Sequence, residues 1–416
     1  MSELRQVPVD GTPRVLVSPS EFQAGASRLA AGTGPFAVDT ERASSYRFDD
    51  RAFLVQIRRE GAGTFLFAPE HHRDELRAAL APVLNGQEWV VHAAPSDLPS
   101  LAWLGLYPGT LFDTELAARF AGFAHPNLAA MVLELFDVEL EKGYGDSDWS
   151  TTPIPRKWRN YAALDVELLN ELAVTLRDIL AEEDKLDWAF EEFERIVEDH
   201  TRITGPEPRS WRDLKGVSSL RSREQLVVAR ELWQRRESIA RSQDVAPNRV
   251  LPHRVLVEIA RRVPRSPHEI NQVKGFPRRR GGATLRWLDA VDTALSIPRQ
   301  QWPKALRSPH PVPSKSVFNR DFPELWQLYT EIRGDFEDLG AELGMNHELI
   351  LKPSLIRAVI WAACGPEGGV AGEIAARADI PDFLRSQGAR EWQIELATPV
   401  LQRGLERRPR STPPRF

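Results

Sequence analysis

The chain has 416 residues, 42% of them hydrophobic and 27% charged, and its formal net charge is −5, values ordinary for a soluble globular protein with room for two or three domains. No stretch approaches the roughly 20 apolar residues of a membrane-spanning helix, and residues 1–11 lack the apolar core of a signal peptide. A single cysteine, Cys364, excludes an intramolecular disulfide framework and a cysteine-based zinc cluster, so we expect a cytoplasmic protein without a membrane partner.

Apolar runs at short spacing predict three strands near the N-terminus. They cover residues 36–38, 53–57 and 64–67. A Gly-Ala-Gly turn separates the last two, which indicates an antiparallel meander. A helix from Pro19 to about Ala31, with Ser20 as its N-cap, precedes the first strand.

Two carboxylates follow the first of these apolar runs. Asp39 and Glu41 occupy alternate positions, which point to the same face of a strand. Acidic residues are disfavoured in strands, and two like charges a few ångströms apart repel by roughly 4 kcal/mol at an effective dielectric constant of 20. A bound divalent cation would turn this repulsion into attraction. Taken alone, the pair is more typical of a solvated strand end before a loop.

The chain then alternates between helices and strands. The patterns predict helices at 73–84, 115–121 and 127–136, and strands at 89–92 and 110–114. This alternation indicates an α/β fold with a mixed sheet. Asp97 begins a helix after the strand at 89–92, where a carboxylate commonly caps free N–H groups. We interpret Asp113 as a structural helix cap and His92 as a buried structural histidine.

A later helical pattern carries a tyrosine and an aspartate one turn apart. Tyr161 and Asp165 share one face of a helix that we expect to continue to about Leu180. An isolated pair of this kind is usually a capping or surface pair. The pair indicates a functional site only in combination with the other acidic positions.

Together and in this order, these signals resemble one known pattern. The positions are Asp39, Glu41, Asp97, Tyr161 and Asp165. They are similar to the motifs of the 3′→5′ exonucleases that use four carboxylates and a tyrosine. The runs VVHAAPSDL, LFDTELAA, SDWSTTPI and NYAALDVELL resemble the ribonuclease D family within that superfamily. The resemblance is close over residues 15–185 and looser toward the C-terminus.

The resemblance implies a ribonuclease H-like exonuclease domain with two divalent metal ions, Mg²⁺ or Mn²⁺. It also implies stepwise hydrolysis of RNA from the 3′ end, with release of nucleoside 5′-monophosphates. By analogy Asp39 bridges both ions, and Glu41 and Asp165 complete one site. Asp97 holds the other ion, directly or through water. Tyr161 orients the attacking water, since a phenol is a poor base near neutral pH.

The C-terminal half differs in charge from the first. Residues 202–310 hold 23 Lys and Arg against 10 Asp and Glu, a local charge of +13 that leaves −18 for the rest. Such a segment suggests a module that binds a polyanion beside an acidic, metal-binding one. The opening W-x-x-L-K-G at Trp211 and the later prolines resemble the helical helicase-and-ribonuclease-D C-terminal (HRDC) domain. A solvated basic surface without a partner is the alternative.

We predict three domains. An exonuclease domain occupies residues 1–200, an HRDC-like all-α domain 205–297, and a second, degenerate HRDC-like helical domain 316–406. Residues 315–395 carry 8 Lys and Arg against 14 Asp and Glu, which favours a scaffolding role for the last domain. Residues 298–315 are expected to be a proline-rich linker, and 407–416 a disordered tail.

Three functions remain open from the sequence. The first is a metal-dependent 3′→5′ exoribonuclease acting on structured RNA ends, with tRNA precursors as the substrate that the resemblance implies. The second is a DNA 3′ exonuclease of the same fold. The third is a catalytically inactive RNA-binding scaffold, against which the presence of all five site residues argues.

Overall fold

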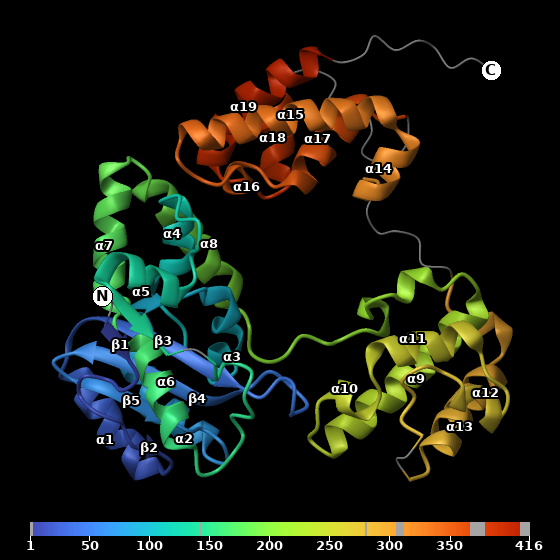
Figure 1. Ribbon diagram of the computed structural model, residues 1–416, viewed down its shortest axis with the longest axis horizontal. Helices are drawn as coiled ribbons and strands as arrows, with labels where there is room; N and C mark the ends of the chain where they lie inside the picture. The colour runs from blue at the N-terminus through green and yellow to red at the C-terminus, as the bar shows by residue number, and fades with distance from the viewer. Residues whose placement is uncertain (1–2, 142, 279–280, 305–311, 367–378, 408–416) are drawn as a thin grey trace.

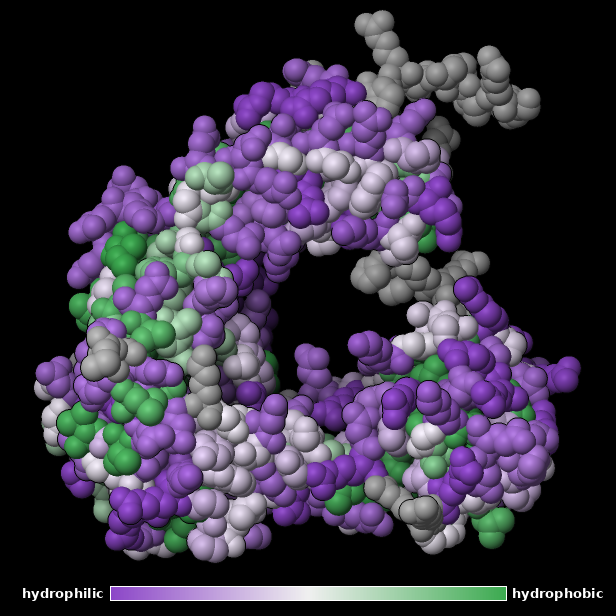
Figure 2. All heavy atoms as spheres, in the orientation of Figure 1, coloured by the Kyte–Doolittle hydropathy of each residue, from purple (hydrophilic) through white to green (hydrophobic). Residues whose placement is uncertain are grey.

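The computed structural model describes residues 3–141, 143–278, 281–304, 312–366 and 379–407. The helices and strands form three lobes: an N-terminal lobe that contains the sheets, and two lobes that are entirely helical (Figure 1). In the space-filling view the three lobes surround a hollow (Figure 2). Across the described ranges, no helix combines the length and apolar character that a membrane crossing requires.

A six-stranded mixed sheet forms the centre of the N-terminal lobe, with strands in the order β2-β5-β4-β3-β6-β7. Its strands are β2 (Val15–Leu16), β3 (Thr33–Arg42), β4 (Ala52–Glu60), β5 (Gly63–Phe67), β6 (Glu88–Val91) and β7 (Thr110–Asp113). β3, β4 and β5 pair antiparallel, which confirms the predicted meander, while β6 and β7 continue the sheet in parallel. A separate parallel ladder joins β1 (Glu3–Arg5) to β8 (Val138–Leu140).

Helices cover this sheet and carry part of the site. They are α1 (Pro19–Ala30), α2 (Arg73–Leu84), α3 (Leu98–Ala102), α4 (Thr114–Phe120), α5 (Leu128–Phe136), α6 (Arg156–Glu167), α7 (Leu169–Glu182) and α8 (Leu186–His200), with a 3₁₀ turn η1 (Ala94–Ser96). Helix α6 packs across β3, β4 and β5. The α/β fold with a mixed sheet is therefore confirmed.

Two local expectations for this lobe are wrong. Helix α1 is capped by Ser18 rather than Ser20, because the Glu21 carboxylate accepts a hydrogen bond from the Ser18 backbone N–H at 3.1 Å. The helix expected to run on to Leu180 breaks at Leu168, whose φ of −112° and ψ of 10° leave the helical region. The break lets α6 lie on the meander while α7 packs on β3, β6 and α4.

The second lobe (residues 211–301) has a hydrophobic core of its own. It comprises η2 (Trp211–Asp213), η3 (Val217–Ser219), α9 (Arg223–Ser242), α10 (Pro247–Val250), α11 (His253–Arg262), α12 (Pro267–Asn271), α13 (Ala283–Ser296) and η4 (Arg299–Gln301). Leu232, Leu256 and Trp287 are buried at its centre. The W-x-x-L-K-G segment that opens this lobe leads through two 3₁₀ turns rather than an α-helix, and Gly216 adopts a φ of +93° between them.

The third lobe (residues 315–406) repeats the helix order of the second. It comprises α14 (Lys315–Asp321), α15 (Pro323–Glu342), α16 (His347–Ile350), α17 (Pro353–Cys364), α18 (Ile380–Ser386) and α19 (Glu391–Glu406). In each lobe a helix of 20 residues is followed by one of 4 residues. This order supports the degenerate second copy, which stays a prediction together with the domain limits. Parts of the expected linker and tail, at 305–311 and 408–416, lie outside the described residues.

Candidate active site

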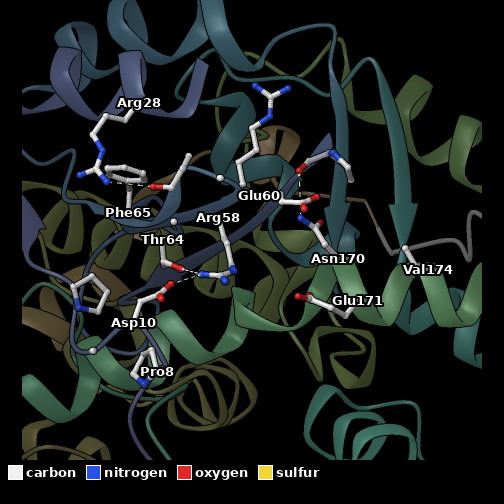
Figure 3. A pocket seen from close by; sticks show the side chains of 17 residues that line it. Pro8, Asp10, Arg28, Arg58, Glu60, Thr64, Phe65, Asn170, Glu171 and Val174 are labelled. Atoms are coloured by element: carbon white, nitrogen blue, oxygen red, sulfur yellow. Dashed lines mark hydrogen bonds and ion pairs between the residues drawn. The ribbon is translucent and has the colours of Figure 1, made fainter. Parts of the chain in front are cut away.

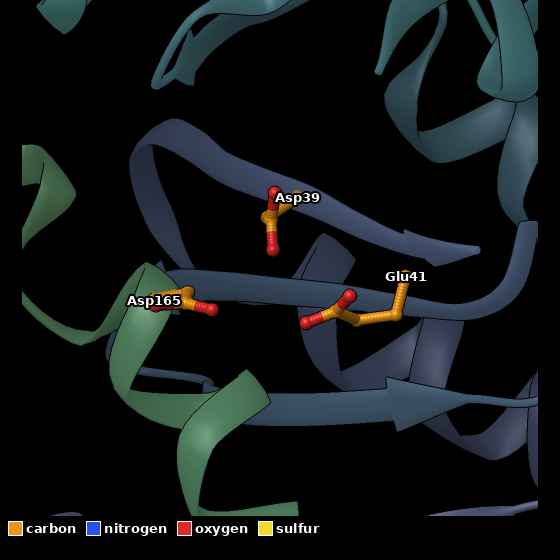
Figure 4. Close-up of side chains that lie close together, drawn as sticks. All are labelled: Asp39, Glu41 and Asp165. Atoms are coloured by element: carbon orange, nitrogen blue, oxygen red, sulfur yellow. The ribbon is translucent and has the colours of Figure 1, made fainter. Parts of the chain in front are cut away.

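Three carboxylates meet where α6 crosses the sheet. Asp39 and Glu41 come from β3 and Asp165 from α6, and one oxygen of each lies within 4.8 Å of the others (Figure 4). The two β3 residues share a face, as the two-residue period of a strand requires. Side chains separated by more than 120 positions in the chain therefore form one acidic cluster.

A glutamine on the neighbouring strand fixes the first of these carboxylates. Gln56 on β4 lies opposite Asp39 in the antiparallel ladder, and its Nε2 donates to Asp39 Oδ2 at 2.6 Å. Gln56 is fully buried. Gln56 is not among the site residues expected from the sequence, although it is the single amide within the apolar run at 53–57.

Asp97 lies beside the cluster but is held by other groups. Thr40 Oγ1 donates to one of its oxygens at 2.7 Å and Ser96 Oγ to the other at 2.9 Å. The Arg42 guanidinium approaches to 3.7 Å. Although Asp97 begins α3, its side chain makes no capping hydrogen bond, so the capping interpretation of this residue is wrong.

The contacts of Asp113 confirm the prediction that it is a structural residue. Its carboxylate accepts hydrogen bonds from the first turn of α4 and from Ala93 N and Ala94 N at 3.0 and 2.8 Å. It thereby anchors the turn that leads to Asp97. His92 is also structural: burial lowers its pKa to about 4, and Nδ1 lies 2.9 Å from Thr114 Oγ1.

Tyr161 stands one helical turn before Asp165 and is hydrogen-bonded to it. Its ring packs against Tyr144 and Trp149, with centroid distances of 5.8 and 6.4 Å. Burial, followed by the charge of Asp165, raises the pKa of this phenol above its ordinary value. Tyr161 therefore keeps its proton near neutral pH and acts as a hydrogen-bond donor rather than as a base.

The charge of the nearby Arg42 does not offset the burial of the clustered carboxylates. Burial raises the pKa of Asp165 to about 7. Burial also raises the pKa of Asp39 and Glu41 well above the ordinary values, with further increases from neighbouring carboxylates. Such groups hold protons unless a cation replaces them. Because hard divalent ions prefer carboxylate oxygens, this donor set fits a divalent metal ion.

A cavity of about 770 Å³ lies at the other end of β3 and is not part of this cluster (Figure 3). Pro35, before the apolar run of β3, and Asn170 on α7 line it. Its arginines are engaged: Arg58 donates to Asp10 at 3.2 Å and to Thr64 at 3.0 Å. Arg58 thereby joins Asp10, near the start of the chain, to the sheet.

Comparisons with known proteins agree with the architecture of all three lobes. Residues 15–181 match a family described as 3′-5′ exonuclease, residues 225–280 match the HRDC domain, and residues 311–405 match a 3′ to 5′ exonuclease C-terminal domain. A protein from Bifidobacterium adolescentis has a similar structure, with a TM-score of 0.81 and 29% identity over 98% of this chain and 100% of that one. Escherichia coli RNase D shares the fold, with a TM-score of 0.67, 23% identity, and coverage of 96% and 100%.

The sequence relationship extends over nearly the whole chain. Over 382 residues the chain is 31% identical to Ribonuclease D of Pseudomonas paraeruginosa. The matched region covers 90% of this chain and 93% of that relative. The chain also contains the acidic cluster on an exonuclease fold and an HRDC match in the second lobe. It belongs to the ribonuclease D family of 3′-5′ exoribonucleases.

Proposed function

We propose that the protein hydrolyses RNA one nucleotide at a time from the 3′ end by a two-metal mechanism, releasing nucleoside 5′-monophosphates. The observation that carries this proposal is the convergence of Asp39, Glu41 and Asp165 within 4.8 Å, next to the protonated Tyr161. These carboxylates would hold the divalent ions, which would supply Lewis-acid activation of the attacking water and stabilisation of the leaving 3′ oxygen.

Each side chain has a distinct part in this scheme. Asp39, oriented by Gln56, would hold divalent metal together with Glu41 and Asp165. Asp97 is the candidate ligand for the second ion. Tyr161 would hold the attacking water through its hydroxyl, since it is anchored to Asp165 and cannot serve as a base near neutral pH.

Structured RNA 3′ ends, including tRNA precursors, are the substrates that we propose. Support comes from the HRDC match in the second lobe and from the whole-length relationship to Ribonuclease D. The local charge of +13 over residues 202–310 would attract the body of a folded RNA. Mg²⁺ and Mn²⁺ are both suitable ions for an all-oxygen site of this kind.

A paired degradation assay tests this function. RNA and DNA oligonucleotides of the same sequence are incubated with the protein in Mg²⁺, in Mn²⁺ and in EDTA, and the products are resolved at single-nucleotide steps. We expect a ladder of shortened RNA and free 5′-monophosphates in the presence of metal, and intact RNA in EDTA. Faster cleavage of the DNA would favour the DNA exonuclease, and cleavage in EDTA would overturn the two-metal mechanism.

A further inference from the structure

The loop that joins β3 to β4, here called the β3–β4 loop (residues 43–51), lies against the second lobe. Ala246 N donates to Tyr46 O at 3.0 Å, and Arg249 Nε donates to Ser45 O at 2.8 Å. The guanidinium of Arg249 also lies over the Tyr46 ring at 4.2 Å. The second lobe thus contacts both the backbone and a side chain of this loop.

One arginine at the end of the loop gathers carboxylates from both lobes. Arg51 forms a bidentate pair with Asp244 of the second lobe, at 3.1 Å to Oδ1 and 2.8 Å to Oδ2. It also donates to Asp49 at 2.8 Å and to Glu70 at 3.1 Å. Its side chain is only 16% exposed. Bidentate pairs of this kind fix orientation as well as distance.

Asp244 is itself built for this contact. It follows α9 in the left-handed backbone region, with a φ of +47°, which turns the chain toward the loop. Besides Arg51, its carboxylate accepts from Phe48 N at 3.4 Å and from Arg47 Nη1 at 3.5 Å. A single carboxylate therefore joins three residues of the β3–β4 loop.

The loop is connected at both ends to the candidate active site. It begins two residues after Glu41, and the intervening Arg42 contacts Asp97 and Ser96 O. It ends where β4 begins, the strand that carries Gln56. Tyr46 N and Arg47 N both donate to Ala43 O, at 2.8 and 2.7 Å, which makes its first turn compact. A displacement of the loop would therefore move residues that hold the carboxylates.

We propose that Asp244 and Arg51 are positioning residues for the exonuclease site: through the β3–β4 loop, the second lobe holds the end of β3 in its working geometry. This inference rests on the proposed function. The second lobe then contributes to the chemical step even for an RNA too short to reach it. A lobe that only captured the body of the RNA would have no effect on such a substrate.

The variant Asp244→Asn tests the proposal in the full-length protein. Asn tolerates the left-handed backbone, so the substitution removes the charge without straining the turn. On an RNA pentanucleotide we expect kcat to fall about tenfold, as for other groups that orient metal ligands, with KM within about twofold of wild type. Weaker binding of the RNA would raise KM instead.

Asp184→Asn is the matched control. Asp184 also has a left-handed backbone, with a φ of +54°, but it lies exposed in the α7–α8 turn of the N-terminal lobe. We expect wild-type kcat and KM for this variant. Wild-type kcat in Asp244→Asn, or an equal loss in Asp184→Asn, would overturn the proposal.

Limited trypsin digestion gives a second measurement that needs no RNA. Cleavage after Arg47, inside the β3–β4 loop, should be faster in Asp244→Asn than in wild type and in Asp184→Asn. An unchanged rate of cleavage would overturn the proposal whether or not the protein degrades RNA. If wild type cleaves no RNA but the digestion behaves as expected, the loop contact stands and the proposed function fails.

Discussion

The two helical lobes are attached to the N-terminal lobe in different ways. The second lobe has a core of its own, against which Phe48 of the β3–β4 loop packs. Its other contacts with the N-terminal lobe are largely polar and include the ion pair of Arg51 with Asp244; just before the lobe, Arg209 pairs with Asp50. The third lobe shares one hydrophobic core with the N-terminal lobe. Polar contacts can break and reform in water, whereas exposing shared apolar surface costs stability.

The shared core between the first and third lobes is aromatic. Trp392 of α19 stacks on Trp188 of α8 at 5.4 Å and lies 5.4 Å from Phe120 of α4. The buried Lys185 Nζ donates to Phe120 O at 3.1 Å and approaches Gly344 O of the third lobe at 3.5 Å. The third lobe is therefore part of the folded unit, while the second can act on the site through its contacts. Loss of activity and loss of stability should separate accordingly.

The largest effect is expected at the acidic cluster, where activity and stability separate completely. Asp39→Asn and Asp165→Asn should each abolish turnover while the fold persists, because each removes a charge that only the ions require. The measurement is RNA degradation in Mg²⁺ together with the thermal unfolding midpoint. Full activity in either variant would exclude the two-metal mechanism.

The next effect concerns stability alone and tests the shared core. Trp392→Ala should cost about 3–5 kcal/mol of unfolding free energy, the usual range for deleting a large buried aromatic side chain. Denaturant unfolding measures it. Asp244→Asn in the polar contact is the comparison variant and should cost far less. Equal losses would mean that the two lobes are attached in the same way.

Tyr161→Phe should reduce the rate without loosening either interface. Deleting the hydroxyl removes the group that positions the water, and one such hydrogen bond is worth about 10²–10³ in rate. The phenyl ring still packs on Tyr144 and Trp149. Single-turnover cleavage and metal titration separate this effect from binding. Wild-type cleavage would show that Tyr161 only fills space.

A smaller effect is expected from pH on the metal-free protein. Because the folded protein raises the pKa of Asp165 to about 7, it binds more protons than the unfolded chain, and stability must fall as pH rises through that value. In EDTA, the thermal unfolding midpoint should therefore be lower at about pH 8 than at about pH 6. Asp165→Asn should weaken this dependence, and Mg²⁺ should offset it. A midpoint that rises over this interval would contradict the assignment.

The elements that carry the site were predictable because their signals are local. Strand spacing placed Asp39 beside Glu41, and helix spacing placed Tyr161 beside Asp165. The contacts that support them were not predictable, since they depend on strand register and lobe docking. Gln56 reaches Asp39 only through the β3–β4 pairing, and Asp244 lies 193 positions from Arg51. No Gly or Pro near Leu168 indicates the helix break at that residue in the sequence.

The smallest expected effect concerns two groups of basic side chains in the second lobe, four residues in each. Arg254, Lys274, Arg278 and Arg286 are exposed and form no ion pair within the described part of the chain. Arg235, Arg261, Arg262 and Arg265 pair with carboxylates of their own lobe. Of these two groups, the first is free to replace counterions on RNA phosphates, whereas the charges of the second are already paired.

Two variants that lose the same number of positive charges test whether RNA binding depends on particular phosphate contacts or on the net charge of the lobe. In each, one group of four is changed to Ala, and binding to a structured RNA is measured over a range of salt concentrations without turnover, in EDTA. Each phosphate contact contributes about 0.7 to 0.9 to the slope of log affinity against log salt. The slope should therefore flatten when the unpaired group is changed and should alter little when the paired group is changed, because the charges of the paired group are already neutralised by their partners.

Substitution is a better test than truncation after residue 200, because truncation would also expose Trp188 and Phe120, which pack against Trp392 of the third lobe. Equal slopes in both variants and wild type would mean that the first group of side chains contacts no phosphates.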